Sequence, residues 1–275
     1  MESLFLKLVF PPPPSLFLNT LSVINLPSFA IGGFSEFRGN NMPYSKFLNS
    51  VTNNFQKQSF NKEKKTEAPS RLGMLICYTP AFLASVAFFL LFPQESYNDI
   101  RMLLLNSALA LHFFKRIFEV LFVHKYSGNM VLNTAIIIGI SYLSSTASLI
   151  YAQHLSQGLA EPPIDLKYIG FVLFLIGLSG NFYHHYLLSL LREKGEKKYK
   201  IPKGGLFGLV ICPHYLFEII EFLGFSFISQ TFHSFSIAIG TMFYLVGRSC
   251  ATRQWYLSKF EDFPQDVKAL IPYVF

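Results

Sequence analysis

The chain has 275 residues, of which 51% are hydrophobic, 17% aromatic and 14% charged. Soluble domains carry roughly 25% charged residues, so this composition excludes an ordinary soluble enzyme. A mean hydropathy of +0.37 indicates that lipid is the solvent for much of the chain. The three cysteines all lie inside apolar stretches, which excludes a disulfide framework and a cysteine-based metal site.

Apolar residues gather in seven blocks, each long enough, at about 20 to 26 residues, to cross a hydrocarbon core of about 30 Å. We therefore predict an all-α integral membrane protein, with about seven transmembrane helices in one bundle that forms a single domain over residues 1–275. The first block is interrupted by Pro27. The blocks are Ser15–Phe34, Leu72–Phe92, Ile100–Val123, Val131–Leu155, Leu166–Leu191, Gly205–Ser229 and Phe232–Tyr256.

Positive charge alternates with the blocks and predicts their orientation. Twenty of the 23 Lys and Arg residues lie at the C-terminal ends of the first, third, fifth and seventh blocks or in the connections after them, and only Lys7, Arg101 and Lys167 lie on the other side. The positive-inside rule then places the C-terminus in the cytosol and the N-terminus across the membrane. Because topology explains the charge, no nucleic-acid partner is predicted. Residues 35–71 are polar and are predicted to form a flexible cytosolic loop, and the N-terminal stretch is interpreted as retained rather than cleaved.

Ionisable side chains inside the predicted spans lie in stripes at helical spacing, all near the same end. Such groups are costly in hydrocarbon and normally face the interior of a bundle. We predict that four stripes converge on one polar cavity open to the cytosol. They comprise His112, Lys115, Arg116 and Glu119; Asn181, His185 and Arg192; His214, Glu218 and Glu221; and Arg248, Thr252 and Tyr256.

Each stripe also has a structural interpretation. Lys115 and Glu119 can form a local ion pair one helical turn apart. The pair His184-His185 can belong to a metal site, but no further histidine cluster is present, so no metal is predicted. Glu218 requires a partner within the membrane, either a ligand amide or an arginine of another helix.

Residues 180–275 carry motifs that resemble the steroid 5α-reductase family. They are LREKGE at Leu191–Glu196, YKIPKGGLF at Tyr199–Phe207, EIIEF at Glu218–Phe222 and KALIP at Lys268–Pro272. The element His112–Arg116 extends the resemblance upstream. His124 and its neighbours resemble the enoyl-CoA reductase and polyprenol reductase branches of the family.

The resemblance implies seven transmembrane helices, residence in the endoplasmic reticulum membrane, NADPH as cofactor and reduction of a carbon-carbon double bond in a lipid. By position, it assigns NADPH contacts to His124, Lys125, Asn181, His185, Arg192, Tyr199, Lys200, His214, Glu218, Arg248 and Tyr256. Some positions depart from the steroid-reducing members, which have Asp at 185, Asn at 214 and His at 252. Their substrate-binding Tyr aligns with Phe113 and their Glu with Tyr78.

Because that pair is replaced, we predict that Tyr78 donates a hydrogen bond to the substrate carbonyl, with His112 and Glu119 as the other catalytic candidates. A tyrosine anchored at the membrane interface is the alternative interpretation. The substrate is left as an enoyl thioester, a polyprenol or a sterol-like lipid. Two other functions remain open: a membrane methyltransferase, and a catalytically weakened relative that acts in a lipid-synthesis complex. The basic segment Arg192–Lys203 favours NADPH, since S-adenosylmethionine has no phosphate.

Overall fold

The computed structural model describes the chain except residues 1–3, 13–14, 48–65, 92–98, 194–195 and 197. Among the described residues there are seven α-helices and one pair of three-residue strands. This confirms the predicted all-α membrane protein. The helices are α1 (Leu16–Phe37), α3 (Ser70–Leu91), α4 (Ile100–Phe118), α5 (Leu132–Leu155), α6 (Lys167–Leu190), α7 (Pro213–Ser229) and α8 (Phe232–Lys259).

The short elements lie at the helix ends. They are the 3-10 helices η1 (Leu4–Lys7), η2 (Ser45–Phe47) and η5 (Gly205–Gly208), the π-helix η4 (Glu119–Val123), and the strands β1 (Glu67–Pro69) and β2 (Asn129–Val131). The two strands pair antiparallel immediately before α3 and α5. Of the predicted loop 35–71, the described parts are the end of α1, the turn that contains η2, and β1 with the start of α3. Residues 48–65 lie outside the described residues.

Four helices, α1, α3, α5 and α6, are long and apolar enough to cross a membrane by length and composition. α7 is shorter, with 17 residues, while α4 and α8 carry more polar side chains. In α4 many of these polar residues are buried inside the bundle, so its sequence is less apolar than that of a helix facing lipid.

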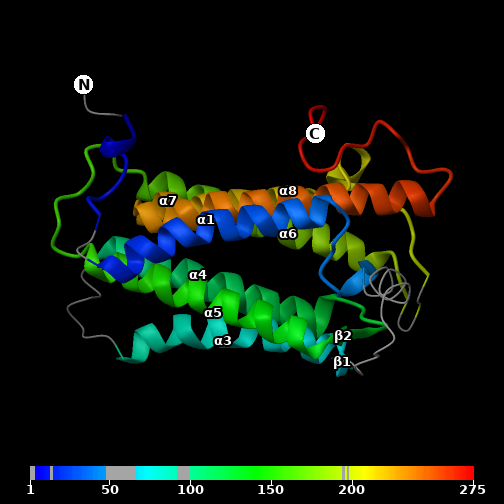
Figure 1. Cartoon of the computed structure of the whole chain (residues 1–275), viewed down its shortest axis with the longest axis horizontal. Helices are drawn as coiled ribbons and strands as arrows, with labels where there is room; N and C mark the ends of the chain where they lie inside the picture. Colours follow the sequence, from blue (N-terminus) through cyan, green and yellow to red (C-terminus); the bar gives the residue numbers. More distant parts are fainter. Residues whose placement is uncertain (1–3, 13–14, 48–65, 92–98, 194–195, 197) are drawn as a thin grey trace.

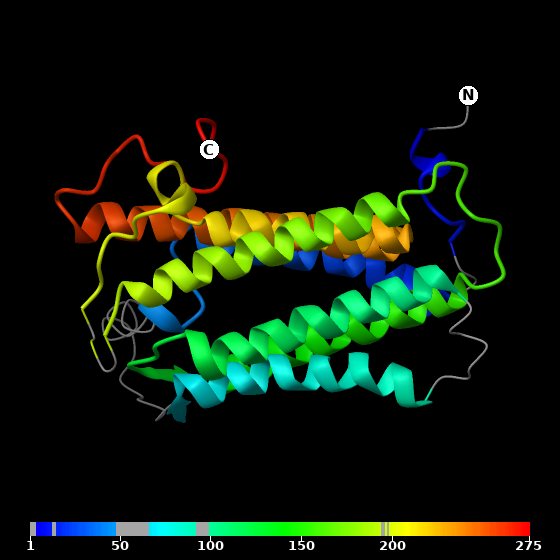
Figure 2. The same ribbon diagram turned by 180° about the vertical axis from the view of Figure 1, so that it is seen from behind.

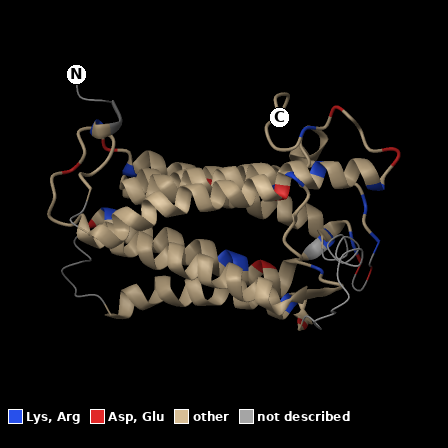
Figure 3. Cartoon of the chain, in the orientation of Figure 1, with Lys and Arg blue, Asp and Glu red and all other residues tan. Residues whose placement is uncertain are grey.

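The helices form two layers (Figure 1). One layer contains α1, α6, α7 and α8, and the other contains α3, α4 and α5, as the view from behind also shows (Figure 2). Within the layers α6 packs on α7, α1 on α8, and α3 on both α4 and α5, while α4 joins the layers through α7. Lys and Arg residues are concentrated at the end of the bundle where the C-terminus lies (Figure 3), which we call the basic end.

Small residues set the closest approaches between helices. A Cβ on Gly177 of α6 would lie 2.5 Å from the backbone nitrogen of Glu221 on α7, and one on Gly33 of α1 would lie 2.3 Å from the Phe243 carbonyl oxygen on α8. In lipid, such contacts replace the hydrophobic effect as a source of helix association. α1 and α3 are continuous through Pro27 and Pro80, so neither proline ends its helix.

One predicted span was wrong at its start. Residues 205–212 are apolar, yet α7 begins only at Pro213, and the stretch before it consists of the short 3-10 helix η5 and a non-helical connection. Gly204 and Gly205 have φ values of +86° and +52°, and Val210 forms a bridge with Lys268 of the C-terminal tail. The tail packs back on this segment through Phe263, Val267 and Leu270, as expected for a tail folded against the helix ends.

Candidate active site

A cavity of about 870 Å³ lies between the two layers and reaches the basic end. It is lined by residues of α1, α3, α4, α5, α6, α7 and α8, and by the turns around residues 44 and 124–130. Ten of the fourteen predicted site residues line it: Tyr78, His124, Lys125, His185, Arg192, Tyr199, Lys200, His214, Glu218 and Tyr256. The stripes seen in the sequence therefore meet at one place.

The wall of the cavity contains a chain of buried polar groups. Arg116 donates through Nη2 to the hydroxyl of Tyr78 at 2.5 Å and through Nη1 to Glu119 Oε2 at 2.9 Å. Nη1 also lies 3.1 Å from His185 Nδ1. Glu119 completes the chain by bonding to His185 at 3.0 Å. A buried arginine is thus held by one carboxylate and contacts a phenol that faces the cavity.

The π-helix η4 positions this carboxylate. The backbone N–H of His124 bonds to the Glu119 carbonyl at 2.7 Å, five residues back. A single π turn at the end of α4 is a feature that often marks a functional site. Burial, with the neighbouring His185 and Arg116, lowers the pKa of His124 to about 3, so its imidazole is neutral at pH 7.

Glu119, His124 and His185 place three potential metal-ligand atoms within 4.8 Å of one another. Arg116 already donates to Glu119, and Lys115 Nζ lies 3.7 Å from its carboxylate. A divalent cation there would meet two cationic side chains, which oppose it electrostatically. The cluster is built as an ion-pair network, so the geometry of the donors does not favour a metal.

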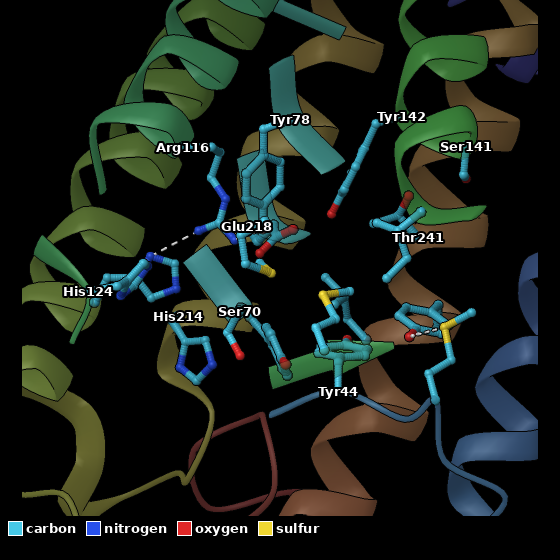
Figure 4. A pocket seen from close by; sticks show the side chains of 18 of the residues that line it. Tyr44, Ser70, Tyr78, Arg116, His124, Ser141, Tyr142, His214, Glu218 and Thr241 are labelled. Atoms are coloured by element: carbon cyan, nitrogen blue, oxygen red, sulfur yellow. Dashed lines mark hydrogen bonds between the residues drawn. The ribbon is translucent and has the colours of Figure 1, made fainter. Parts of the chain in front are cut away.

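Glu218 points into the cavity below Tyr78, with Arg116 on one side of it and Tyr142 on the other (Figure 4). Its side chain is buried, and within the part of the chain that the structure describes its carboxylate forms no hydrogen bond or ion pair. Tyr142 of α5 packs against both Tyr78 and Phe113, with ring centroids 5.5 and 5.6 Å apart. This part of the cavity therefore combines two phenols with a carboxylate available to a ligand.

The basic end of the cavity is lined by Lys46, Lys125, Arg192 and Lys200. The guanidinium of Arg192 lies 4.2 Å from the centre of the Tyr199 ring, and Lys125 donates to the Arg192 carbonyl at 2.7 Å. Lys46 lies over the rings of Trp255 and Tyr256. These cations, flanked by aromatic faces, form a binding surface suited to phosphates and planar rings.

The other four predicted residues lie behind the lining. His112 bonds to the buried Glu221 at 2.7 Å, and Glu119 bonds to Arg116. Asn181 bonds to Lys115 and donates to the His214 carbonyl at 2.8 Å. Arg248 pairs with Glu36 of α1 at 2.7 Å. Their contacts are those of residues that hold the lining in place.

Comparison with known proteins agrees with this arrangement. Residues 127–275 match the family described as 3-oxo-5-alpha-steroid 4-dehydrogenase. The chain is 31% identical over 199 residues to the steroid 5-alpha-reductase DET2 of Gossypium hirsutum, an alignment that covers 68% of this chain and 76% of that protein. It belongs to the steroid 5α-reductase family.

Two mammalian members of the steroid 5α-reductase family are also similar. The 3-oxo-5-alpha-steroid 4-dehydrogenase 2 of Homo sapiens is 30% identical over 219 residues, covering 78% of this chain and 84% of that protein. The 3-oxo-5-alpha-steroid 4-dehydrogenase 1 of Mus musculus is 41% identical over 105 residues, covering 38% of this chain and 41% of that protein. The resemblance found in the C-terminal motifs is thereby confirmed.

Lys46 and Tyr142 are among the lining residues that sequence reasoning missed in this family member. Lys46 falls in the segment interpreted as a loop, and Tyr142 falls among apolar residues of the fourth block. For Lys46 the only signal was its neighbour Tyr44, an aromatic residue beside a cation. For Tyr142 the signal was its position among Ile138, Ser145 and Leu149, which share one helical face.

Proposed function

We propose that this protein is an NADPH-dependent reductase of a carbon-carbon double bond conjugated to a carbonyl group in a steroid-like lipid. The names of its relatives describe oxidoreductases that act on such a bond in steroids. For this chain, the proposal rests on the contact between Arg116 and Tyr78 in the cavity wall. By family position, the substrate-binding Tyr and Glu of the steroid-reducing relatives are replaced here, and the Tyr78 hydroxyl offers a hydrogen-bond donor in their place.

The residues present suit the proposed cofactor. Four cationic side chains line one end of the cavity, and polyphosphate binding needs such a concentration of charge. Arg192, Lys125, Lys46 and Lys200 would hold the phosphates, and Glu218 and His214 lie further inside. When bound, NADPH supplies the hydride that adds to the β-carbon of the substrate. S-adenosylmethionine has no phosphate for these cations, which argues against a methyltransferase.

Tyr78 would act on the carbonyl end of the substrate. Its oxygen accepts a hydrogen bond from Arg116, so its own O–H remains free to donate into the cavity. Negative charge develops on the carbonyl oxygen as the double bond is reduced, and a positioned donor stabilises it. Tyr78 thus acts as a hydrogen-bond donor to the oxygen, and the reduction is completed when the α-carbon takes a proton from solvent water and the carbonyl group is restored.

The test is NADPH oxidation by the purified protein, followed at 340 nm, with products identified by mass spectrometry. The panel contains a steroid enone, an enoyl thioester and a polyprenol. We expect turnover with the steroid enone, giving a product heavier by two hydrogens. A catalytically weakened relative would show no turnover with any of them. A methyltransferase would transfer a methyl group to a lipid without oxidising NADPH.

We further propose that the basic end faces the cytosol and that the protein resides in the endoplasmic reticulum membrane. The charge distribution supports this orientation, since positive residues near the spans stay on the cytosolic side. A C-terminal tag should be digested by protease added to sealed microsomes. Protection of that tag from the protease would show that the C-terminus lies on the lumenal side instead.

A further inference from the structure

The region of the cavity away from Arg116 has several polar side chains in its lining. We call it the inner arm and define it by six lining residues: Asn25 and Ser28 of α1, Ser141, Ser145 and Thr146 of α5, and Thr241 of α8. Figure 4 shows Ser141 and Thr241 beside Tyr142, on the side of the cavity away from Arg116. A cavity that received only a hydrocarbon chain would need none of these groups.

Most of these groups have no internal partner. Serines inside membrane helices commonly donate to the carbonyl four residues back, as Ser22, Ser156 and Ser249 do in this protein. Among the described residues, no such bond is made by the side chains of Asn25, Ser141, Ser145, Thr146 and Thr241; only Ser28 bonds to its own helix.

Thr146 is the clearest case. Its side chain is 2% exposed, yet it lines the cavity and has no hydrogen-bond partner among the described residues. Its hydroxyl is nevertheless accessible from the cavity, because among the described residues it is not one of the enclosed side-chain atoms that lack a partner. A ligand that brings its own polar group into the inner arm can therefore form a hydrogen bond with it.

The contact between α3 and α5 shows how deep the inner arm lies. Both helices start at the paired strands β1 and β2, and a Cβ on Gly139 of α5 would lie 2.7 Å from the Ile76 carbonyl of α3. Ile76 and Gly139 therefore lie at the same depth. Tyr78 is two residues beyond Ile76 along α3, whereas Ser145 and Thr146 are six and seven residues beyond Gly139 along α5. At 1.5 Å per residue, these hydroxyls lie roughly 7 Å deeper than Tyr78.

The contacts between α1 and α8 place the remaining groups together. A Cβ on Gly240 of α8 would lie 2.9 Å from the ring of Phe29 on α1. Thr241 and Ser28, the neighbours of these two residues, are therefore at about the same level on two facing helices. The inner arm thus presents hydroxyls from both layers at the end opposite the cationic entrance.

We infer that the inner arm binds hydroxyl groups at the end of a rigid ring lipid remote from its enone. This inference rests on the proposed function, since it takes the enone to lie at Tyr78. A rigid ring system can bridge the distance between Tyr78 and the inner arm while keeping its two polar ends apart. A polyprenol or a fatty acyl chain would place methylene groups against these hydroxyls and leave them unsatisfied.

The experiment compares two steroid enones that differ only in hydroxyl groups at the end remote from the enone. Thr146→Val removes a hydroxyl at constant shape, and Ser145→Ala is a second, independent variant. Ser144→Ala is the control, because Ser144 lies on the same helix, is exposed and does not line the cavity. Melting temperatures in detergent verify that each variant is folded.

We expect wild-type protein to prefer the hydroxylated enone, and Thr146→Val to lower its kcat/KM about tenfold, the effect of one hydrogen bond. The rate on the enone without hydroxyls should be unchanged, and Ser144→Ala should affect neither substrate. Equal losses on both substrates, or a wild-type preference for the enone without hydroxyls, would overturn the inference.

Ligand-induced shifts in melting temperature separate this inference from the proposed function. If neither enone is reduced but the hydroxylated one stabilises wild type more than Thr146→Val, the proposed reaction fails and the inner arm keeps its role. If turnover is normal and wild type and Thr146→Val have the same ratio of kcat/KM between the two enones, the inference fails and the proposed reaction stands. Equal stabilisation of both proteins in the absence of turnover would reject both.

Discussion

Arg116 of α4 and Tyr78 of α3 are 38 positions apart in sequence, and a hydrogen bond of 2.5 Å from Arg116 Nη2 to the Tyr78 phenol oxygen joins their helices. The guanidinium also lies over the Tyr78 ring, 4.7 Å from its centre. Arg116 is fixed on its other side by Glu119 and His185. The phenol therefore faces the cavity with a cation held against it, and the donor role that we propose for Tyr78 rests on this contact.

Replacing Tyr78 with Phe removes only the hydroxyl. If Tyr78 stabilises the transition state, turnover should fall about 100-fold while the KM for NADPH is unchanged. Steady-state kinetics on the accepted lipid measure this, and Tyr183→Phe on the exposed face of α6 is the control. Unchanged turnover in Tyr78→Phe together with a large loss in Tyr142→Phe would assign the donor role to Tyr142.

Arg192 should distinguish NADPH from NADH. Its guanidinium lies at the basic end of the cavity and is held against Tyr199. Arg192→Ala is expected to raise the KM for NADPH by about tenfold or more, which is the effect of a lost charge-assisted hydrogen bond. The KM for NADH should change much less. Lys259→Ala, an exposed change outside the cavity, controls for general charge. An equal rise in KM for both cofactors would show that Arg192 does not bind the extra phosphate of NADPH.

Lys46 should make cofactor binding depend on pH. Burial, reinforced by Arg248 and Arg192, lowers the pKa of this half-buried lysine to about 8. The free protein then loses the charge as pH rises through 8, so kcat/KM for NADPH should fall between pH 7 and 9. Lys46→Arg stays charged and should flatten the profile over that interval. A profile of the same steepness in Lys46→Arg would contradict a phosphate role for Lys46.

The same shift has a consequence for folding. The folded-state pKa of Lys46 lies below its ordinary value of 10.5, so the unfolded state binds the proton more tightly. The cost of burying the charge is present below pH 8 and disappears as pH rises from 8 to 10.5. This residue alone therefore makes the folded state more stable over that window, while the cofactor is bound more weakly.

The helices could be predicted because each apolar block ends at charged or turn-forming residues. α5 and α6 begin and end within one residue of the predicted blocks. The start of the block 205–229 was wrong because apolar composition does not distinguish a helix from a segment packed under the tail. The positive φ values of Gly204 and Gly205 are typical of such a segment. Hydropathy measures burial, and both kinds of segment are buried.

Helical periodicity could predict which site residues share one face of a helix, but not which contacts those residues make. Spacing placed His185 and Arg192 on one stripe, and both line the cavity, His185 from α6 and Arg192 from the segment just after it. It could not show that Asn181, on the same stripe, bonds to Lys115 instead of lining the cavity. Nor could it place Lys46, because the turn that carries Lys46 is held by an ion pair between residues 36 and 248, which no local pattern reveals.

That ion pair gives a final prediction, because Arg248 was assigned to the cofactor by family position. Glu36 accepts bonds from Arg248 at 2.7 Å and from the backbone N–H of Met42 at 2.9 Å. Arg248 also lies over the rings of Tyr44 and Phe47, 4.2 Å from each ring centre. The pair therefore anchors residues 41–47, the turn that carries Lys46 to the cavity.

Arg248→Met leaves the Glu36 carboxylate buried without its cation, which typically costs about 3 to 5 kcal/mol. We expect a lower melting temperature in detergent together with weaker NADPH binding, because Lys46 loses its support. Adding Glu36→Gln to Arg248→Met should recover part of the lost stability, since the uncompensated charge is then gone. Direct contact of Arg248 with the cofactor predicts a different pattern. The KM for NADPH would rise at an unchanged melting temperature, and the second substitution would restore nothing.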